Sequence, residues 1–384
     1  MRLPVLGMVC YPGQGGSGVV ATELGLHLAR RGFEVHFIAS EMPLRLRRYR
    51  RNVFFHRVDL VDYPVFQHPP YTLALAATIH AVAVRHGLDL VHAHYALPHA
   101  AAALLARDMG GGRTRVVTTL HGTDITIVGQ QPAMVDLTRH LVERSDAVTA
   151  VSRRLARETE QVFAPRRAIT VIPNFVDPRR FRPDAALPRD EFARPDEALL
   201  LHASNLRPVK NVAAVVRVLA GVHAHRPARL LLVGEGPQRE EARRLAETLD
   251  VADRITWLGE VERLEELLGA ADLLLLPSWH ESFGLVALEA MACGTPALAT
   301  TAGGTAEFID DGQTGLLRDP DDVPGMVTAA TALLDDPERL RRMGEDARRA
   351  AVSRFGADCV VRQYLDLYDT LLDGGSGTGG GAPV

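Results

Sequence analysis

Two glutamates eight positions apart, Glu281 and Glu289, are the first residues of this sequence whose types and spacing suggest chemistry. Glu281 follows the apolar run 271–276, which predicts a buried strand of a parallel sheet, and the segment from Gly284 predicts a helix. Eight helical residues rise about 12 Å and rotate a side chain by about 80°, so both carboxylates can face one elongated ligand. Two solvated glutamates are the alternative, but ligands of such sheets sit beyond the strand ends, where Glu281 lies. We therefore expect a nucleotide sugar, with Glu281 near the sugar and Glu289 at the ribose hydroxyls.

The second half of the chain also carries basic residues and a pair of glycines that suit a diphosphate. Arg207 and Lys210 come after the expected strand 198–203, and Gly303-Gly304 forms a glycine loop that opens on an expected helix. Bare backbone N–H groups at such a loop can bind phosphate. The alternative, two solvated charges at a helix start, is weaker because the position after a strand favours a phosphate role.

The first half carries a dense glycine cluster between an expected strand, 3–10, and a helix expected from Val19. Its glycines at 13, 15 and 18 match the dinucleotide-binding fingerprint, and Glu41 stands where that fold places a ribose-binding acid. A nicotinamide oxidoreductase is therefore a serious alternative.

Polar side chains end several expected strands of the first half. His121 follows strand 115–120 and precedes Gly122, which allows close approach of a ligand. His94 and His99 are interpreted as satisfied turn residues.

Strands and helices alternate along most of the chain, which predicts an α/β fold with two doubly wound parallel domains. The expected boundaries are 1–174 with a returning helix at 357–373 for the first domain, and 175–356 for the second. Residues 173–195 are expected to form the linker. The glycine-rich segment 374–384 is expected to be a disordered tail.

Composition excludes several classes of protein. The chain has 384 residues and a formal net charge of −4, which gives no indication of nucleic acid or an anionic membrane as partner. Its three cysteines show no paired spacing, so we expect a reducing cytoplasm and neither a disulfide framework nor a zinc site. No apolar run approaches the length of a transmembrane helix.

Taken together, these motifs resemble the retaining nucleotide-sugar glycosyltransferases of family four. That resemblance implies the B-type fold, in which two facing Rossmann-like domains enclose a cleft. Glu281 and Glu289 match the family's glutamate pair, Gly303-Gly304 its diphosphate loop, and His121 the histidine beside the donor sugar. Longer strings resemble the malate-accepting branch that makes bacillithiol precursors. These strings are 10–12, 15–25, 94–96, 118–126, 172–177 and 204–210.

The resemblance implies transfer of N-acetylglucosamine from UDP-GlcNAc to the hydroxyl of L-malate, with retention. The implied catalytic residues are His121, Lys210, Arg207 and Glu281. The implied donor-binding residues are Gly15, Gly16, Asn205, Lys210, Ser282, Phe283, Gly284, Leu285, Glu289, Gly303 and Gly304. The implied acceptor-binding residues are Ser17, Tyr95, Thr119, Asn174 and Arg207.

One departure from the family pattern concerns the basic residues. Many members place an arginine five positions before the phosphate-binding lysine, where this chain has Asn205 and places Arg207 three before Lys210. Whether Arg207 reaches the diphosphate or the acceptor's carboxylate stays open. Basic charge can replace magnesium at a diphosphate, so no metal and no cofactor is expected.

Four alternatives remain at this point: another family-four transferase with a different small acceptor, a UDP-sugar epimerase, the nicotinamide oxidoreductase, and a sensor that binds a sugar nucleotide without turnover. A homo-oligomer is compatible with the sequence, which does not decide the oligomeric state.

Overall fold

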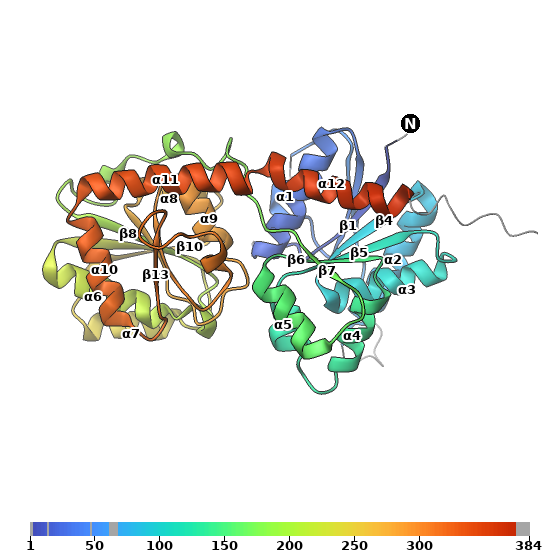
Figure 1. The fold of residues 1–384 in the computed structure, drawn as a ribbon, viewed down its shortest axis with the longest axis horizontal. Coiled ribbons are helices and arrows are strands. Elements are labelled where there is room, and N and C mark those ends of the chain that lie inside the picture. The colour runs from blue at the N-terminus through green and yellow to red at the C-terminus, as the bar shows by residue number, and fades with distance from the viewer. Residues whose placement is uncertain (1–2, 14, 47, 61–67, 374–384) are drawn as a thin grey trace, which may run out of the picture. The chain divides into compact units, whose positions relative to one another are not determined.

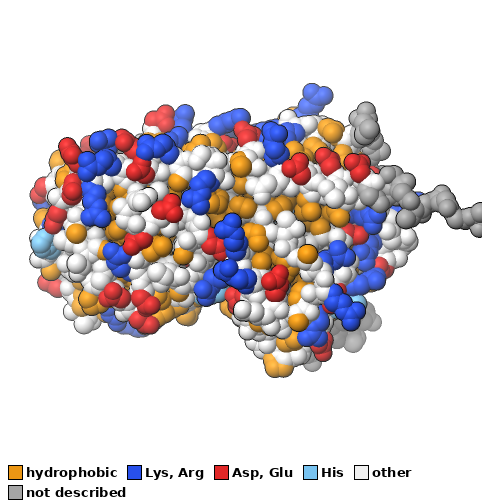
Figure 2. All heavy atoms as spheres, viewed as in Figure 1, with side chains coloured by type: hydrophobic (Ala, Val, Ile, Leu, Met, Phe, Trp, Pro, Cys, Tyr) orange, Lys and Arg blue, Asp and Glu red, His pale blue; other side chains and the backbone are white. Residues whose placement is uncertain are grey.

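The computed structural model describes residues 3–13, 15–46, 48–60 and 68–373 (Figure 1). The chain divides into two compact units, Met1–Pro173 with the segment from Val360, and Asn174–Cys359. The expected tail, 374–384, lies outside the described residues. Basic and acidic side chains are interspersed on the face shown in Figure 2.

Within its described residues, the first unit contains a seven-stranded parallel sheet in the order β3-β2-β1-β4-β5-β6-β7. Its strands are β1 (Val5–Val9), β2 (Glu34–Ala39), β3 (Val53–Arg57), β4 (Leu90–His94), β5 (Arg115–Leu120), β6 (Ala147–Ala150) and β7 (Ile169–Val171). Its helices are α1 (Gly16–Arg30), α2 (Tyr71–His86), α3 (Ala101–Met109), α4 (Val135–Arg144) and α5 (Arg153–Phe163). The central strands are buried on both faces, which explains their continuous apolar runs.

The second unit repeats this plan with a parallel sheet in the order β10-β9-β8-β11-β12-β13. Its strands are β8 (Ala198–Ala203), β9 (Ala228–Val233), β10 (Ile255–Gly259), β11 (Leu273–Leu276), β12 (Ala297–Thr300) and β13 (Leu316–Arg318). Its helices are α6 (Val212–His225), α7 (Arg239–Thr248), α8 (Leu264–Ala270), α9 (Leu285–Ala292), α10 (Val323–Leu334) and α11 (Pro337–Phe355).

Both sheets have the Rossmann strand order, so the prediction of two doubly wound parallel sheets is confirmed. The order reverses between β1 and β4 in the first sheet and between β8 and β11 in the second. Ligands of such sheets bind at the carboxyl ends of the strands beside these reversal points.

The final helix is α12 (Ala357–Asp373), and from Val360 onward it belongs to the first unit. Tyr364 and Tyr368 are fully buried, and the Tyr368 hydroxyl is hydrogen bonded to His92 Nδ1 at 2.7 Å. The hydrogen bond joins two residues 276 positions apart, so the helix is part of the first unit's core.

Two expectations about local structure are wrong. The first helix begins at Gly16 rather than Val19, so Gly18 lies in its first turn, where an added Cβ would be 2.5 Å from the carbonyl oxygen of Tyr11. The segment expected as a linker is held on the second unit: the Arg189 guanidinium contacts the Asp272 carboxylate at 2.8 Å, and the Leu187 N–H donates to the Glu266 carbonyl. Among the described helices, none is long and apolar enough to cross a membrane.

Candidate active site

An ion pair spans the reversal point of the second sheet. Lys210 lies in the loop after β8 and Glu281 in the loop after β11, and Lys210 Nζ is 2.7 Å from Glu281 Oε2 and 3.1 Å from Oε1. The two side chains are 16% and 12% exposed, so the pair is shielded but still reachable from solvent. A backbone hydrogen bond from the Trp279 N–H to the Val209 carbonyl ties the same two loops together.

Lys210 is the only lysine in the sequence, and the other residues counted among the 43 Lys and Arg are arginines. An ammonium group is a compact charge with three donors, whereas a guanidinium is a broad planar fork. The two carboxylate oxygens of Glu281 hold this one ammonium in place. Asn205 and Arg207 are exposed in the same loop.

The glycine loop after β12 packs directly on the segment that begins at Glu281. Gly303 forms a bridge with Glu281, and the Gly304 N–H donates to the Glu281 carbonyl at 2.7 Å. A Cβ on Gly303 would lie 2.6 Å from that carbonyl oxygen, and one on Gly304 would overlap the carbonyl of Ser282. The expectation that Gly304 offers its N–H to phosphate therefore needs correction, because this N–H is already used within the protein.

Glu281 and Glu289 do not share one continuous helix. The helical rise and rotation expected between their side chains therefore do not apply. Gly284 adopts a left-handed φ of 92°, so α9 begins at Leu285 and Glu281 stands in the loop before it. Glu289 lies in the second turn of α9 and is 7% exposed. Phe283, expected at the donor, is buried and stacks on Phe308 with ring centroids 5.0 Å apart.

In the first unit, Asp124 fixes the loops after β4 and β5. Its carboxylate accepts the N–H groups of His121 at 3.3 Å, Gly122 at 3.0 Å and Ala96 at 2.9 Å. Burial raises the pKa of Asp124 to about 6, although these hydrogen bonds oppose that rise. His121 is therefore held at the end of β5 by a neighbour three positions away.

His121 is the outermost member of a buried histidine cluster. His121 Nε2 is hydrogen bonded to His94 Nδ1 at 2.9 Å, and His99 Nδ1 donates to the His94 carbonyl. Burial lowers the pKa of His121 to about 3 and that of His99 to about 4, so both rings are neutral near pH 7. His94 and His99 thus support His121 rather than serving as ordinary turn residues.

Aromatic rings cover the reversal point of the first sheet beside this cluster. Tyr11 follows β1 and Tyr95 follows β4, and their ring centroids are 5.5 Å apart. Tyr95 also lies 5.2 Å from the His121 ring. Ser17 is half-buried in the first turn of α1, and Gly15 and Gly16 are exposed at its start. That turn contains no acidic side chain, which leaves it suited to an anion.

Similarity to known proteins identifies the family of this chain. The family model Glycosyltransferase Family 4 matches residues 14–180, and the model Glycosyl transferases group 1 matches residues 184–350. The N-acetyl-alpha-D-glucosaminyl L-malate synthase of Bacillus anthracis is 46% identical over 98% of this chain and 100% of that protein. The chain belongs to glycosyltransferase family four.

This family-four glycosyltransferase is also similar to proteins that have other names. A D-inositol 3-phosphate glycosyltransferase of Nocardia farcinica is 34% identical over 93% of this chain and 85% of that protein. Anabaena HepE, solved in complex with UDP and glucose, is 20% identical and superposes with a TM-score of 0.82 over 96% of this chain and 100% of that chain. The structural likeness supports the B-type fold, and the family membership removes the oxidoreductase alternative.

Of two further residues expected at the acceptor of this glycosyltransferase, the structure assigns Thr119 to the core, whereas the acceptor role of Asn174 stays a prediction. Thr119 is fully buried, and its hydroxyl is hydrogen bonded to His92 Nε2 and Thr149 Oγ1 at 2.6 Å each, so it serves the core of the first unit. Asn174 belongs to the second unit and is 6% exposed, and its Oδ1 has no hydrogen-bond partner among the described residues.

Sequence reasoning missed Asp124, His94 and the Lys210–Glu281 ion pair. The sequence held no clear signal for Asp124, because short acids usually accept backbone N–H groups that follow them, whereas Asp124 accepts those of His121 and Gly122, which precede it. The ion pair joins residues 71 positions apart and has no local signal either.

Proposed function

We propose that this glycosyltransferase moves N-acetylglucosamine from UDP-GlcNAc to the hydroxyl of L-malate, with retention at the anomeric carbon. The observation that carries the proposal is the 46% identity to the Bacillus anthracis synthase over nearly the whole of both chains. The product is the sugar-malate conjugate expected of a bacillithiol precursor, and the proposed location is the cytoplasm.

The second unit binds the donor in this proposal. Lys210 neutralises the diphosphate, and Glu281 holds the ammonium in place through both carboxylate oxygens. Arg207 and Asn205, exposed in the same loop, add donors. Such preorganised donors are commonly worth about 3 kcal/mol each in catalysis, because charge develops on the departing UDP. Glu289 accepts hydrogen bonds from the ribose hydroxyls.

The proposed reaction is same-face substitution. The bond between the anomeric carbon and the phosphate oxygen breaks, the malate oxygen bonds to that carbon, and the malate hydroxyl proton passes to the departing phosphate oxygen. A double displacement would need a carboxylate nucleophile about 5 Å from an acid. Glu281 is paired with Lys210, which makes it a poor nucleophile. His121, neutral near pH 7, positions the sugar by hydrogen bonding rather than by donating a charge-neutralising proton.

The acceptor is a dianion with one hydroxyl, so its site needs several donors. The start of α1, with Ser17, Gly15 and Gly16, offers backbone N–H groups to one carboxylate. Tyr95 and Asn174 are further donors, and Arg207 can pair with a carboxylate. No metal is required in this scheme.

A UDP-release assay with UDP-GlcNAc tests the proposal, using L-malate, D-malate, succinate and D-inositol 3-phosphate as acceptors and mass spectrometry of the products. L-malate should be strongly preferred, and succinate, which lacks the hydroxyl, should give no glycoside. Transfer to inositol phosphate with none to L-malate would replace the acceptor, as the 34% identical relative suggests, and leave the family unchanged. Isomerisation of the donor without an acceptor would indicate an epimerase, and binding without consumption a sensor.

The single lysine permits a direct test of its role. An amine-reactive ester can label only Lys210 and the N-terminal amine. UDP should slow the labelling of Lys210, measured by peptide mass spectrometry, while the N-terminal amine serves as the internal control. Equal labelling of Lys210 with and without saturating UDP would contradict the diphosphate role.

A further inference from the structure

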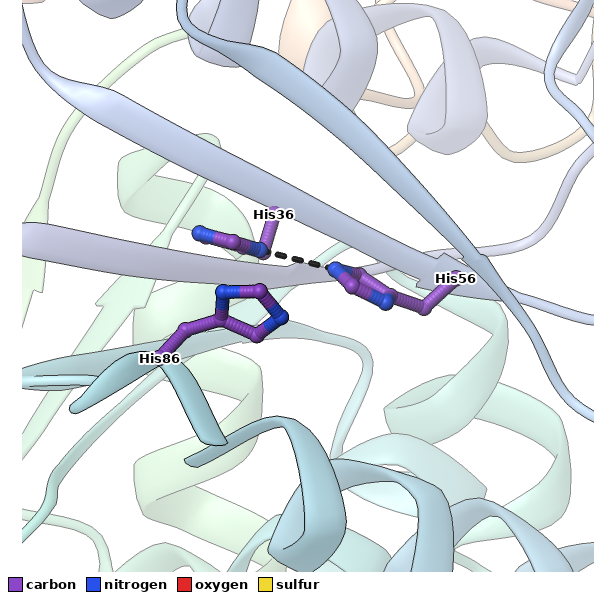
Figure 3. A group of neighbouring side chains, drawn as sticks. All are labelled: His36, His56 and His86. Atoms are coloured by element: carbon purple, nitrogen blue, oxygen red, sulfur yellow. Dashed lines mark hydrogen bonds between the residues drawn. The ribbon is translucent and has the colours of Figure 1, made fainter. Parts of the chain in front are cut away.

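Three histidines from three different elements converge beside the edge of the first sheet. His36 lies on β2, His56 on the edge strand β3, and His86 is the last residue of α2 (Figure 3). One ring nitrogen of each lies within 4.8 Å of the others. His36 is buried, and the other two are half-buried, so the cluster is open on one side.

The backbone explains why these rings meet. His36 is two positions before Ile38, which is the registered partner of His56 in the parallel pair, so His36 and His56 point to the same face of the sheet. Helix α2 packs on this face, where Leu75, Ile79 and Val82 join the core with Ile38. The helix ends at His86 because Gly87 turns the chain with a left-handed φ of 68°.

The hydrogen bonds set the rings as metal ligands require. Glu34 Oε1 lies 2.9 Å from His36 Nε2, and a carboxylate only accepts, so this nitrogen carries the proton. His36 Nδ1 therefore presents its lone pair, and it faces His56 Nε2 at 2.7 Å. A carboxylate that holds the outer N–H of a histidine is the usual second partner of a metal-binding imidazole.

We propose that His36, His56 and His86 bind one Zn²⁺ ion, with Glu34 orienting His36. Zinc takes imidazole nitrogens at about 2.0–2.1 Å in a tetrahedral arrangement, which places them about 3.3 Å apart. To bind the ion, the facing nitrogens of His36 and His56 must move slightly apart, and the His86 ring must move inward. Rotation of the half-exposed rings allows both changes. Three ligands leave the fourth position to water. The ion fastens the edge strand β3 and the end of α2 to β2.

The test uses the full chain after removal of metals with a chelator. Calorimetry with ZnCl₂ should give one equivalent of saturable binding, and Co²⁺ should give the visible absorption of a tetrahedral site with nitrogen ligands. His86→Gln removes a ligand at a half-exposed position and should abolish this stoichiometric binding. Glu34→Gln, which keeps all three ligands, should weaken binding by about 10- to 100-fold. The matched control is His140→Gln, an exposed histidine on α4, which should bind zinc as the unaltered chain does.

A readout on the unaltered chain guards against variants that fold poorly. Zinc should raise its melting temperature and protect His56 and His86 from diethyl pyrocarbonate, measured by peptide mapping. Absence of saturable binding in the unaltered chain would overturn the proposal. So would one equivalent bound with undiminished affinity by a His86→Gln variant whose metal-free melting curve matches that of the unaltered chain.

Discussion

The ion pair between Lys210 and Glu281 joins the loops that follow β8 and β11. Lys210 ends the short turn Pro208–Lys210 after β8, and its role at a phosphate stays a prediction. Its pairing with Glu281 depends on β8 and β11 being neighbours in the sheet, which is a property of the fold and not of local spacing. The pairing changes the interpretation of Glu281 from a residue that touches the sugar to one that also holds the ammonium.

Glu289→Ala should weaken UDP binding by about 1 to 3 kcal/mol, because two ribose hydroxyls lose a charged acceptor. Glu289 is buried in the second turn of α9, so calorimetry with UDP should be accompanied by a melting curve that checks the fold. Glu260→Ala, at an exposed position of the same unit, is the matched control and should leave the affinity unchanged. Unaltered UDP affinity in a folded Glu289→Ala protein would contradict the ribose role.

At the scale of elements, the long periodic segments were predictable and the short ones were not. The expected strands 115–120 and 198–203 and the expected helix 357–373 have the observed bounds of β5, β8 and α12. The strands β12 and β13, of four and three residues, went unpredicted because so few residues cannot show a period. The start of α9 was predicted at Gly284 and lies at Leu285, with Gly284 in the left-handed conformation at its N-cap.

The contact between the two loops at Gly304 yields a prediction about the donor site. Gly304→Ala should cost about 1 to 3 kcal/mol of stability, since its Cβ would overlap the Ser282 carbonyl, and the displaced loop should also bind UDP more weakly. Melting curves and calorimetry measure the two effects. Gly13→Ala, whose added Cβ meets no described atom within 4 Å, is the control and should change neither quantity. Full UDP affinity in Gly304→Ala would mean that this loop does not shape the donor site.

A series of buried hydrogen bonds connects α12 to the first sheet. It runs from the Tyr368 hydroxyl through His92 to Thr119 and Thr149. Tyr368→Phe leaves His92 Nδ1 without its partner in a fully buried position and should lower the free energy of unfolding by about 1 to 3 kcal/mol. Chemical denaturation measures the change. Tyr49→Phe, at a side chain 89% exposed, should be neutral. Equal stability of the Tyr368→Phe protein would show that the hydrogen bond does not hold the helix.

At the scale of the whole molecule, two parallel sheets with reversal points were predictable from the alternation of strands and helices, and so was the family. The clustering of histidines was not. His36, His56 and His86 stand 20 and 30 positions apart in the chain, and His92, His94 and His121 meet only because β4 and β5 are adjacent. The spacing of these histidines in the chain therefore predicted no metal site, and His94 and His99 were interpreted as turn residues.

Burying several neutral histidines makes stability depend on pH. Burial lowers the pKa of His92 and His121 to about 3 and of His99 to about 4, and that of His94 lies well below its usual value. Unfolded histidines titrate near pH 6.5, so between pH 6.5 and 4 the unfolded chain takes up protons that the folded chain does not. Each histidine then lowers stability by up to about 1.4 kcal/mol per pH unit as the pH falls.

Asp124 acts in the opposite direction. Its folded pKa, about 6, lies above the ordinary value of 3.8, so its contribution to stability is present at acid pH and is lost as the pH rises through 6. The effect of Asp124 on stability cancels that of about one histidine, so the net effect of the four histidines is a loss of stability as the pH falls. We therefore expect the free energy of unfolding to be several kcal/mol lower at pH 5 than at pH 7.

Denaturant titrations of the metal-free chain at pH 7.5, 6.5, 5.5 and 5.0 measure this slope, and removal of metal keeps zinc dissociation from contributing. His99→Gln should reduce the slope of the free energy of unfolding against pH by the equivalent of about one proton. The reason is that the His99 ring is buried and its Nε2 has no described partner. Asp124→Asn should make it steeper, because the opposing group is gone. His140→Gln, exposed on α4, should leave the slope as it is. A flat profile from pH 7.5 to 5.0, or an equal slope in His99→Gln, would mean that these rings take up protons within the fold.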